Sequence, residues 1–369
     1  MGPGSTEEAS GAYQYGVERV RAYAGLISAL AAGSLLLALP PAAQGKTGAP
    51  APLSVAWPTA SKAALPATLP DKTPYEPTLF LDANTSVGTA PTPDNKSLRL
   101  LIRTKTEKVL RTLPSTANPS FQSVTVAGGT LGWFERTDKG GLQLWTADLK
   151  TGAVRQVTAD TGLARFYRSD NDLVIADGRF RWVASGPRDT TEVRSVALAG
   201  GPVEVRPEPG SWRFTGWPWL VDGATSTTGA TTLRNVVTGQ DVKVKTTRKA
   251  ATDCSPTWCQ VVSLDEDGFS RIELMRPDGS ARVDVAGDTA NTEIVDVAPL
   301  GKFEIFVRID ANSELTGNAE LLMYEIATHR TVQVSPDAGQ IAYRNGVLSW
   351  STGNLETFVR HSLDLRTIH

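Results

Sequence analysis

The 369-residue sequence predicts an all-β protein of the β-propeller class, preceded by one N-terminal hydrophobic helix. Two observations predict the propeller: a strand–turn–strand phrase that recurs along the chain, and an apolar strand residue about twenty positions before most of those turns. The 33 glycines and 23 prolines fit a chain with many turns. We therefore expect short strands and tight turns from residue 78 to residue 369.

The composition excludes several classes of function. The 37 Lys and Arg residues are balanced by 39 Asp and Glu residues, which argues against a nucleic-acid partner, because neutralising phosphates requires an excess of basic side chains. Two cysteines are too few for an iron–sulfur cluster or a four-thiolate zinc site, and three histidines leave little for a histidine-based one. We expect no metal site and no cofactor.

The N-terminal region predicts a membrane anchor. Residues 1–22 are polar, and residues 23–39 form an uncharged stretch with Arg19 and Arg21 before it. A membrane helix needs roughly 17 to 25 apolar residues, whereas the core of a signal peptide runs to about 15. We interpret 23–39 as a transmembrane signal-anchor, with a cleaved signal peptide as the alternative. The flanking arginines predict a cytoplasmic N-terminus and an extracytoplasmic propeller, which would be secreted if the segment were cleaved.

Residues 40–77 are rich in proline and alanine, and this composition predicts a semi-extended spacer. One piece of it, residues 53–57, has strand character. The last repeat ends so close to the C-terminus that only Arg366–His369 remain for its outer strand. Residues 53–57 are therefore a candidate for completing the last blade and closing the ring.

The repeat itself is visible in two sets of markers. The turn residues of the recurring phrase lie at 107, 152, 200, 239, 279, 329 and about 365. The apolar strand residues are Trp133, Trp182, Trp219, Cys259, Phe306 and Trp350. Both sets recur at intervals of about 43 residues, which is enough for about four short strands per unit. Residues 78–369 then hold about seven blades, with six as the other count; a β-sandwich or two stacked β domains is the alternative architecture.

Some of these phrases resemble a known family. Residues 144–158 contain an Asp-x-x-x-Gly turn from Asp148 to Gly152, followed by a short strand and Thr158, and residues 276–279 read Arg-Pro-Asp-Gly. They resemble the repeats of TolB-like and other WD40-like exported bacterial β-propellers, and the whole composition is similar to uncharacterised actinobacterial ones. Most units lack the fuller Ser-Pro-Asp-Gly phrase of that family. The resemblance implies a fold and export from the cytoplasm, and it implies no particular chemistry.

Cys254 and Cys259 are the sharpest local feature. In an exported domain, two nearby cysteines form a disulfide more readily than a redox or metal site. Closing so short a loop stabilises the fold by about 2 kcal/mol in the chain-entropy model. We expect this disulfide to fix the loop that enters the fifth unit.

Trp212 and Trp217 belong to the densest aromatic cluster of the sequence. Such a cluster favours either packing between blades or a stacking platform for a flat ligand such as a sugar. Trp217 is not explained by the repeat, and it is the better candidate for an exposed ring.

No sequence motif identifies catalytic residues, since there is no Gly-x-Ser-x-Gly elbow and no catalytic metal motif. Two acidic loops, at 265–268 and 310–314, resemble the start of calcium loops without their later ligands. We therefore expect a monomeric, non-catalytic binding module whose partner is a protein or a cell-wall glycan. The alternative is a glycan-binding or glycan-active propeller with paired carboxylates at one mouth of the channel, drawn from Asp148, Asp265, Asp267 and Asp310.

Overall fold

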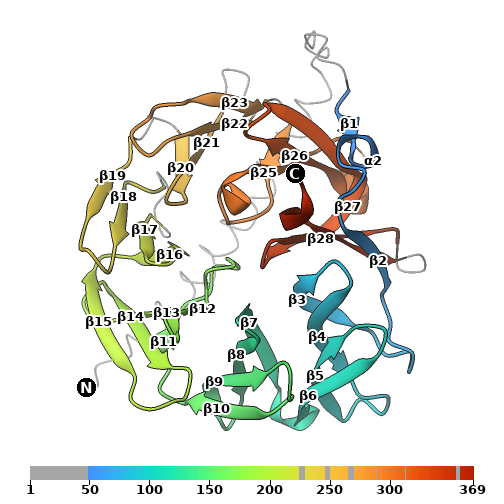
Figure 1. Cartoon of the computed structure of the whole chain (residues 1–369), viewed down its shortest axis with the longest axis vertical. Helices are drawn as coiled ribbons and strands as arrows, with labels where there is room; N and C mark the ends of the chain where they lie inside the picture. Colours follow the sequence, from blue (N-terminus) through green and yellow to red (C-terminus); the bar gives the residue numbers. More distant parts are fainter. Residues whose placement is uncertain are drawn as a thin grey trace, which may run out of the picture. The chain divides into compact units, whose positions relative to one another are not determined.

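The structure, a computed structural model, describes residues 49–369 except 224–228, 246–249, 265–269, 288, 312, 355–357 and the side chain of Glu314. Within Pro50–His369, antiparallel sheets are arranged around a central axis, and the first strands of the sheets lie nearest that axis (Figure 1). The prediction of an all-β protein built from four-stranded sheets is confirmed for this part of the chain. The predicted hydrophobic helix, 23–39, lies outside the described residues.

Five sheets follow one another along the chain, and four of them pair each strand with the next. In chain order the first two contain β3 (Glu76–Asp82), β4 (Thr85–Pro91), β5 (Ser97–Arg103) and β6 (Glu107–Pro114), then β7 (Ser120–Ala127), β8 (Thr130–Thr137), β9 (Gly141–Asp148) and β10 (Val154–Thr158). The third contains β11 (Leu163–Ala164), β12 (Val174–Ala176), β13 (Arg179–Ser185), β14 (Thr190–Ala197) and β15 (Glu204–Pro209), with β11 and β12 both pairing with β13.

The fourth and fifth sheets have four strands each. They contain β16 (Trp212–Gly216), β17 (Trp219–Asp222), β18 (Thr232–Asn235) and β19 (Asp241–Lys243), then β20 (Ala250–Cys254), β21 (Cys259–Leu264), β22 (Ser270–Met275) and β23 (Val283–Ala286). Short helical turns connect or end strands elsewhere in the chain: η1 (Ser115–Ala117), η2 (Pro299–Gly301), α3 (Ser313–Thr316) and η3 (Leu365–Thr367).

The remaining strands form an eight-stranded sheet that one long strand divides into two halves. Its strands are β24 (Ala290–Thr292), β25 (Phe303–Arg308), β26 (Ala319–Glu325), β27 (Arg330–Arg344), β28 (Val347–Thr352) and β29 (Val359–Asp364), with β1 (Ala51–Pro52) and β2 (Lys62–Pro66) from the N-terminal side. The first part of β27 pairs with β26, and its last part pairs with β28. Each half therefore resembles the four-stranded sheets that precede it.

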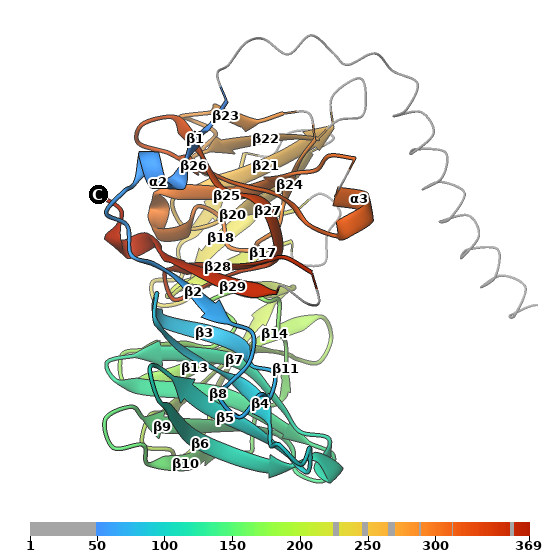
Figure 2. The same cartoon turned by 90° about the vertical axis from the view of Figure 1, so that its right-hand side faces the viewer.

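An N-terminal strand completes the last half, but it is not the predicted segment. β2 pairs with β29 along its whole length (Figure 2), whereas Leu53–Ala56 forms the short helix α2. Residues 50–77, predicted as part of the spacer, thus pack on the sheets, and Trp57 is buried with its ring 5.7 Å from that of Phe303. A proline can end an edge strand such as β2 because its missing N–H faces no partner there.

The aromatic and apolar markers of the sequence occupy one structural position. Trp133, Trp182, Trp219, Cys259, Phe306 and Trp350 all lie on the second strand of their sheet or half-sheet. Trp133 and Trp182 are fully buried. Each of the apolar clusters that contain them joins two neighbouring sheets, as when Trp133 packs with Leu79 and Leu100 of the preceding sheet. The apolar markers of the sequence repeat therefore arise from the packing of each sheet against its neighbour.

The turn markers also share one position, between the third and fourth strands. Gly152, Gly200, Gly239 and Gly279 all adopt a positive φ there, which costs glycine little and other residues more. His329 occupies the same place before β27 with a φ of 53°. The glycines of the sequence thus mark tight turns at the outer edge of the sheets.

Candidate functional site

A polar segment between β11 and β12 reaches across the axis of the ring. The Ser169 hydroxyl donates to Asp296 Oδ1 at 2.6 Å, and the Asn171 side-chain amide donates to the same oxygen at 3.2 Å. The backbone N–H of Asp170 donates to the other oxygen of Asp296 at 2.9 Å. Asp296 lies between β24 and η2, so these bonds join segments 125 to 127 residues apart.

A second set of bonds extends this contact to the turn between β27 and β28. Asn345 donates its backbone N–H to Asp170 Oδ1 at 2.9 Å and its side-chain amide to the carbonyl of Phe80 at 2.9 Å. The segment 169–171 therefore connects the third sheet to both halves of the eight-stranded sheet, and Asn345 adds the first sheet. Polar side chains from distant parts of the chain meet at the axis.

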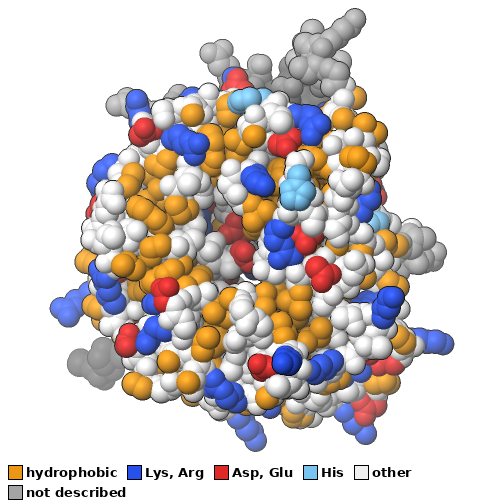
Figure 3. Space-filling view, viewed as in Figure 1, with side chains coloured by type: hydrophobic (Ala, Val, Ile, Leu, Met, Phe, Trp, Pro, Cys, Tyr) orange, Lys and Arg blue, Asp and Glu red, His pale blue; other side chains and the backbone are white. Residues whose placement is uncertain are grey.

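Beside this crossing lies a pocket of about 260 Å³. Its lining is mostly polar or small, and acidic side chains are visible in the central hollow of the molecule (Figure 3). The residues are Asp170, Asn171, Thr215, Ser255, Pro256, Thr257, Asp296, Val297, Ala298, Pro299, Leu300, Gly301 and Tyr343. We refer to this cavity as the axial pocket. It offers carboxyl and hydroxyl groups in a volume that suits a small molecule.

Two carboxyl groups near the axial pocket, those of Asp170 and Asp172, have a raised pKa. Burial, followed by the nearby Asp296 carboxylate, raises the pKa of Asp170 to about 6. Burial also raises the pKa of Asp172 to about 6. The positive charge of Arg344 opposes both shifts without cancelling them. Asp170 is therefore mostly ionised at pH 7 and mostly protonated at pH 5.

One wall of the pocket is a turn held by a buried carboxyl group. Glu304 is fully buried, its Oε2 accepts the backbone N–H of Ala298 at 3.1 Å, and its Oε1 accepts the side-chain amide of Gln260. Burial raises the pKa of Glu304 to about 8, so the group is mostly neutral at pH 7. Ala298 and Leu300 adopt positive φ values of 49° and 56°, a backbone conformation that residues other than glycine rarely adopt.

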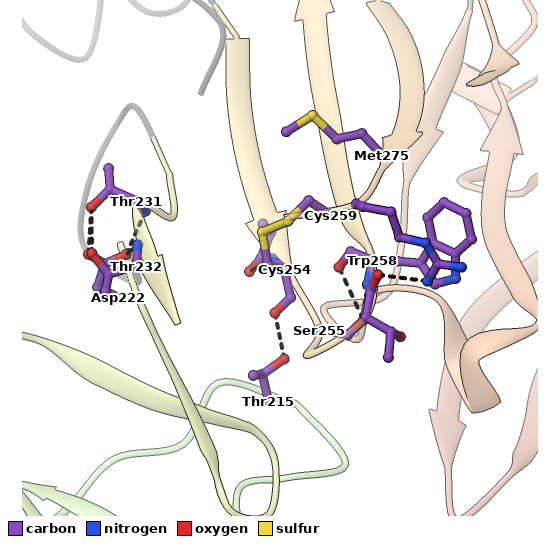
Figure 4. The surroundings of a disulfide bond; sticks show 12 residues. Thr215, Asp222, Thr231, Thr232, Cys254, Ser255, Trp258, Cys259 and Met275 are labelled. Carbon is purple, nitrogen blue, oxygen red and sulfur yellow. Dashed lines mark hydrogen bonds between the residues drawn. A yellow bond between two sulfur atoms is a disulfide. The ribbon is translucent and has the colours of Figure 1, made fainter. Parts of the chain in front are cut away.

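Another part of the wall is the hairpin that the disulfide closes. Cys254 at the end of β20 and Cys259 at the start of β21 form a disulfide, as the sequence predicts (Figure 4). The Thr215 hydroxyl donates to the Cys254 carbonyl at 2.6 Å, and the Trp258 N–H donates to the Ser255 hydroxyl at 3.1 Å. These bonds fix Ser255, Pro256 and Thr257 beside the pocket.

The two tryptophans predicted as a ligand platform lie elsewhere. Trp212 is 5% exposed, donates its ring N–H to the Pro209 carbonyl at 2.7 Å and is covered by the Arg234 guanidinium. Trp217 donates its ring N–H to Asp177 at 2.9 Å, and the Arg181 guanidinium lies 3.8 Å from the centre of its ring. Neither ring lines the axial pocket.

The carboxylates proposed from the sequence are not brought together at the axis. Asp148 accepts the Thr151 N–H in an outer turn, and Asp310 accepts the Ser313 N–H in an exposed one. Asp265 and Asp267 lie outside the described residues, as do Asn312 and the side chain of Glu314 from the second acidic loop. Over the part of the chain that the structure describes, no group of three His, Cys, Asp or Glu residues is arranged to hold a metal ion.

The sequence did not single out Asp170, Asp296 or Tyr343, the residues that give the pocket its character. They lie between strands or near the end of a long strand, where the repeat leaves no marker. One signal was available: the polar run from Ser169 to Asp172 stands where its unit should begin with a strand. As for membrane-spanning structure, the described ranges contain no helix with the length and apolar character to cross a bilayer.

Comparisons with known proteins bear on the fold. No family model matches the chain, and no curated protein sequence matches it. Among solved structures, uncharacterized protein lmo1340 from Listeria monocytogenes EGD-e is 8% identical, with 83% of this chain and 95% of that one covered and a TM-score of 0.54. A structure from a study of two prolyl endopeptidases is 13% identical, with 79% and 48% covered and a TM-score of 0.52.

TolB from Acinetobacter baumannii also matches, at 10% identity and a TM-score of 0.41, with 68% of this chain and 63% of TolB covered. The chain thus spans less than two thirds of the length of that TolB. Likenesses at such identities concern the fold alone. TolB-like propellers are among the solved structures that this chain resembles, as the sequence predicts, and the actinobacterial type stays a prediction.

Proposed function

We propose that this chain is a non-catalytic binding module, a seven-bladed β-propeller that takes a small polar ligand in its axial pocket. Counting each half of the eight-stranded sheet as one blade gives the seven. The observation that carries the proposal is the axial pocket, in which side chains as distant in sequence as Asp170, Asp296 and Tyr343 line one cavity.

The lining indicates the chemistry of the ligand. Oδ1 of Asp170 accepts a hydrogen bond from the Asn345 N–H, and the described residues supply no hydrogen-bond partner for Oδ2. An ionised carboxylate of this kind favours a protonated amine. The Thr257 hydroxyl is exposed, and the Thr215 oxygen, whose hydroxyl already donates to the Cys254 carbonyl, can still accept from a ligand hydroxyl group. An amino sugar combines these features, which agrees with a cell-wall glycan as the partner.

The hydrogen bonds of Asp296, the second carboxylate of the axial pocket, favour binding over catalysis. A glycosidase needs two carboxyl groups that can both reach the substrate. Both oxygens of Asp296 already accept hydrogen bonds, from Ser169, Asn171 and the Asp170 N–H. Asp296 therefore acts as a positioning residue that holds the crossing segment, and Asp170 is the carboxyl group left to meet a ligand.

The location outside the cytoplasm is part of the same proposal. Residues 23–39 would anchor the chain in the cell membrane, with the propeller on the outer side, or would be removed to release a secreted protein. In either case the axial pocket would meet glycans or proteins of the cell surface. The disulfide between Cys254 and Cys259 suits an oxidising compartment.

The test is a calorimetric titration of the full-length protein with D-glucosamine and with D-glucose, which lacks the amine. We expect saturable binding of glucosamine at pH 7 and much weaker binding of glucose. Asp170→Asn should weaken glucosamine binding about tenfold, because it removes the charge and keeps an oxygen for the Asn345 N–H. Asp138→Asn, at an exposed turn, is the matched control and should change nothing. Equal affinity for the two sugars, or an unaffected Asp170→Asn variant, would contradict the proposal.

One observation favours a second candidate, a glycan-active enzyme. A pKa of about 6 would suit Asp170 to donate a proton to a leaving group. If this candidate is right, the full-length protein should hydrolyse methyl glucosaminide, whose alkoxide must be protonated as it leaves, near pH 6, and Asp170→Asn should abolish the reaction. Binding of glucosamine without any hydrolysis would leave the binding module as the function.

A further inference from the structure

A second hollow, of about 730 Å³, lies between the fifth sheet and the first half of the eight-stranded sheet. It is lined by Thr257, Trp258, Arg276, Ala281, Arg282, Val283, Gly301, Lys302, Ile326, Ala327 and His329. We refer to it as the basic groove. Thr257 and Gly301 line both this groove and the axial pocket. The disulfide-closed hairpin and the η2 turn therefore separate two cavities of opposite character.

The lining of the basic groove is positively charged. Arg276, Arg282 and Lys302 belong to it together with His329, and no acidic residue does. Arg282 is balanced by Glu273, whose carboxylate lies 3.1 Å from its guanidinium. Within the described ranges, Arg276 and Lys302 form no ion pair with an acidic side chain. Two uncompensated cations therefore face a hollow that no part of the described chain fills.

Arg276 is also held in place before any ligand arrives. Its guanidinium carbon lies 3.8 Å from the centre of the Trp258 ring, and its Nη1 donates to the Thr257 carbonyl at 3.0 Å. Trp258 is itself buried in the core between the two sheets. A guanidinium oriented in this way loses little freedom on binding and presents further N–H groups to a carboxylate or phosphate.

Most of the rest of the lining is apolar. Ala281 and Ala327 are exposed and Val283 is half-buried, while the buried Trp258 and Ile326 contribute only their edges. A cavity of several hundred cubic ångströms with a few placed charges and an apolar lining is typical of small-molecule sites. A purely solvated basic surface would offer neither the hollow nor the apolar contacts.

We propose that the basic groove binds an organic anion, a carboxylate or phosphate group attached to an apolar body. Arg276 and Lys302 neutralise the anionic group, and the apolar body lies against Val283, Ala281 and Ala327. This site is separate from the axial pocket and does not depend on the function proposed for it.

The experiment is a calorimetric titration of the full-length protein with hexanoate, hexyl phosphate and the neutral 1-hexanol. Hexanoate or hexyl phosphate should bind saturably, and the stronger of the two identifies the anionic group. Arg276→Gln and Lys302→Gln should each weaken that binding about tenfold, since each removes one charged contact. Hexanol should bind at least tenfold more weakly than the preferred anion.

Lys139→Gln is the matched control, because Lys139 is exposed in the turn before β9 and lies outside the groove. It should bind the anions as the unchanged protein does. Thermal unfolding of each variant shows whether it is folded, and glucosamine binding reports separately on the axial pocket. The proposal is overturned if hexanol binds as well as the anions, if neither anion binds, or if folded Arg276→Gln and Lys302→Gln variants keep the original affinity.

Discussion

The buried carboxyl group of Glu304 has a strongly raised pKa. Glu304 has no exposed surface, and its two oxygens accept from the Ala298 N–H and the Gln260 amide. In the unfolded chain this carboxyl group would ionise near pH 4.5, whereas in the folded protein it holds its proton to about pH 8. The folded state therefore binds more protons than the unfolded state between these values. Stability must fall as the pH rises from about 4.5 to about 8 and then level off.

Replacing Glu304 by Gln tests this directly. The Gln260 amide can turn over so that its oxygen accepts from the new side chain, which keeps both hydrogen bonds. We expect the variant to lose the decline in stability across this pH window, an effect on the order of a few kcal/mol at pH 8. Urea unfolding at pH 5 and pH 8 measures it. Glu293→Gln, at an exposed position, should keep the decline; a decline that persists unchanged in Glu304→Gln would show that Glu304 is not its source.

Among the elements, β2 has the clearest consequence for the fold. It pairs with β29 from Lys62 to Pro66, so the last half-sheet takes its outer strand from the N-terminal side of the chain. The segment before it adds buried side chains, among them Leu53 and Trp57. The ring is thus closed by residues from its two ends.

Two truncations separate this closure from the N-terminal region. A variant lacking residues 1–48 keeps β1, α2 and β2, and we expect it to unfold cooperatively. A variant lacking residues 1–67 loses β2 and Trp57 and should be destabilised by more than about 3 kcal/mol, since burial of one large aromatic side chain alone is worth that much. Chemical denaturation compares the two variants. Equal stability would mean that the β2 pairing does not hold the ring closed.

The sequence predicted the repeated strands and turns better than the N-terminal strand that completes the last blade. Trp133 and Trp182 stood out because every unit must bury a large side chain at the same strand position, and Gly152 and Gly279 because a tight turn needs a positive φ. Residues 62–66 carry no such signal, because one face of an edge strand is half exposed and the strand ends in a proline. The strand character of residues 53–57 therefore pointed to the wrong segment for the last blade.

At the scale of the whole molecule, the candidate site depends on contacts between distant residues, which no local sequence pattern predicts. Ser169 and Asp296 are 127 residues apart, and Asp170 and Asn345 are 175 apart, so their meeting follows only from the closure of the ring. The disulfide between Cys254 and Cys259 was predictable because its partners are close in sequence. The axial pocket was not, since its polar residues come one or two at a time from the third, fourth and fifth sheets and from the eight-stranded sheet.

If the axial pocket binds the proposed amino sugar, its affinity should depend on pH. Asp170, which faces Asp296, Asp172 and Arg344, changes from mostly protonated to mostly ionised between pH 5 and pH 7. A protonated amine gains a charged partner over this range, while a neutral sugar does not. Asp172 titrates in the same range, and the Asp170→Asn variant separates the two contributions.

The most direct test of the binding function is therefore the affinity of the full-length protein for D-glucosamine at pH 5, 6 and 7. The axial pocket predicts an increase of about tenfold from pH 5 to pH 7 with its midpoint near pH 6, and a much smaller change in Asp170→Asn. An affinity that is the same at all three pH values, or that changes equally in the variant, would contradict the account.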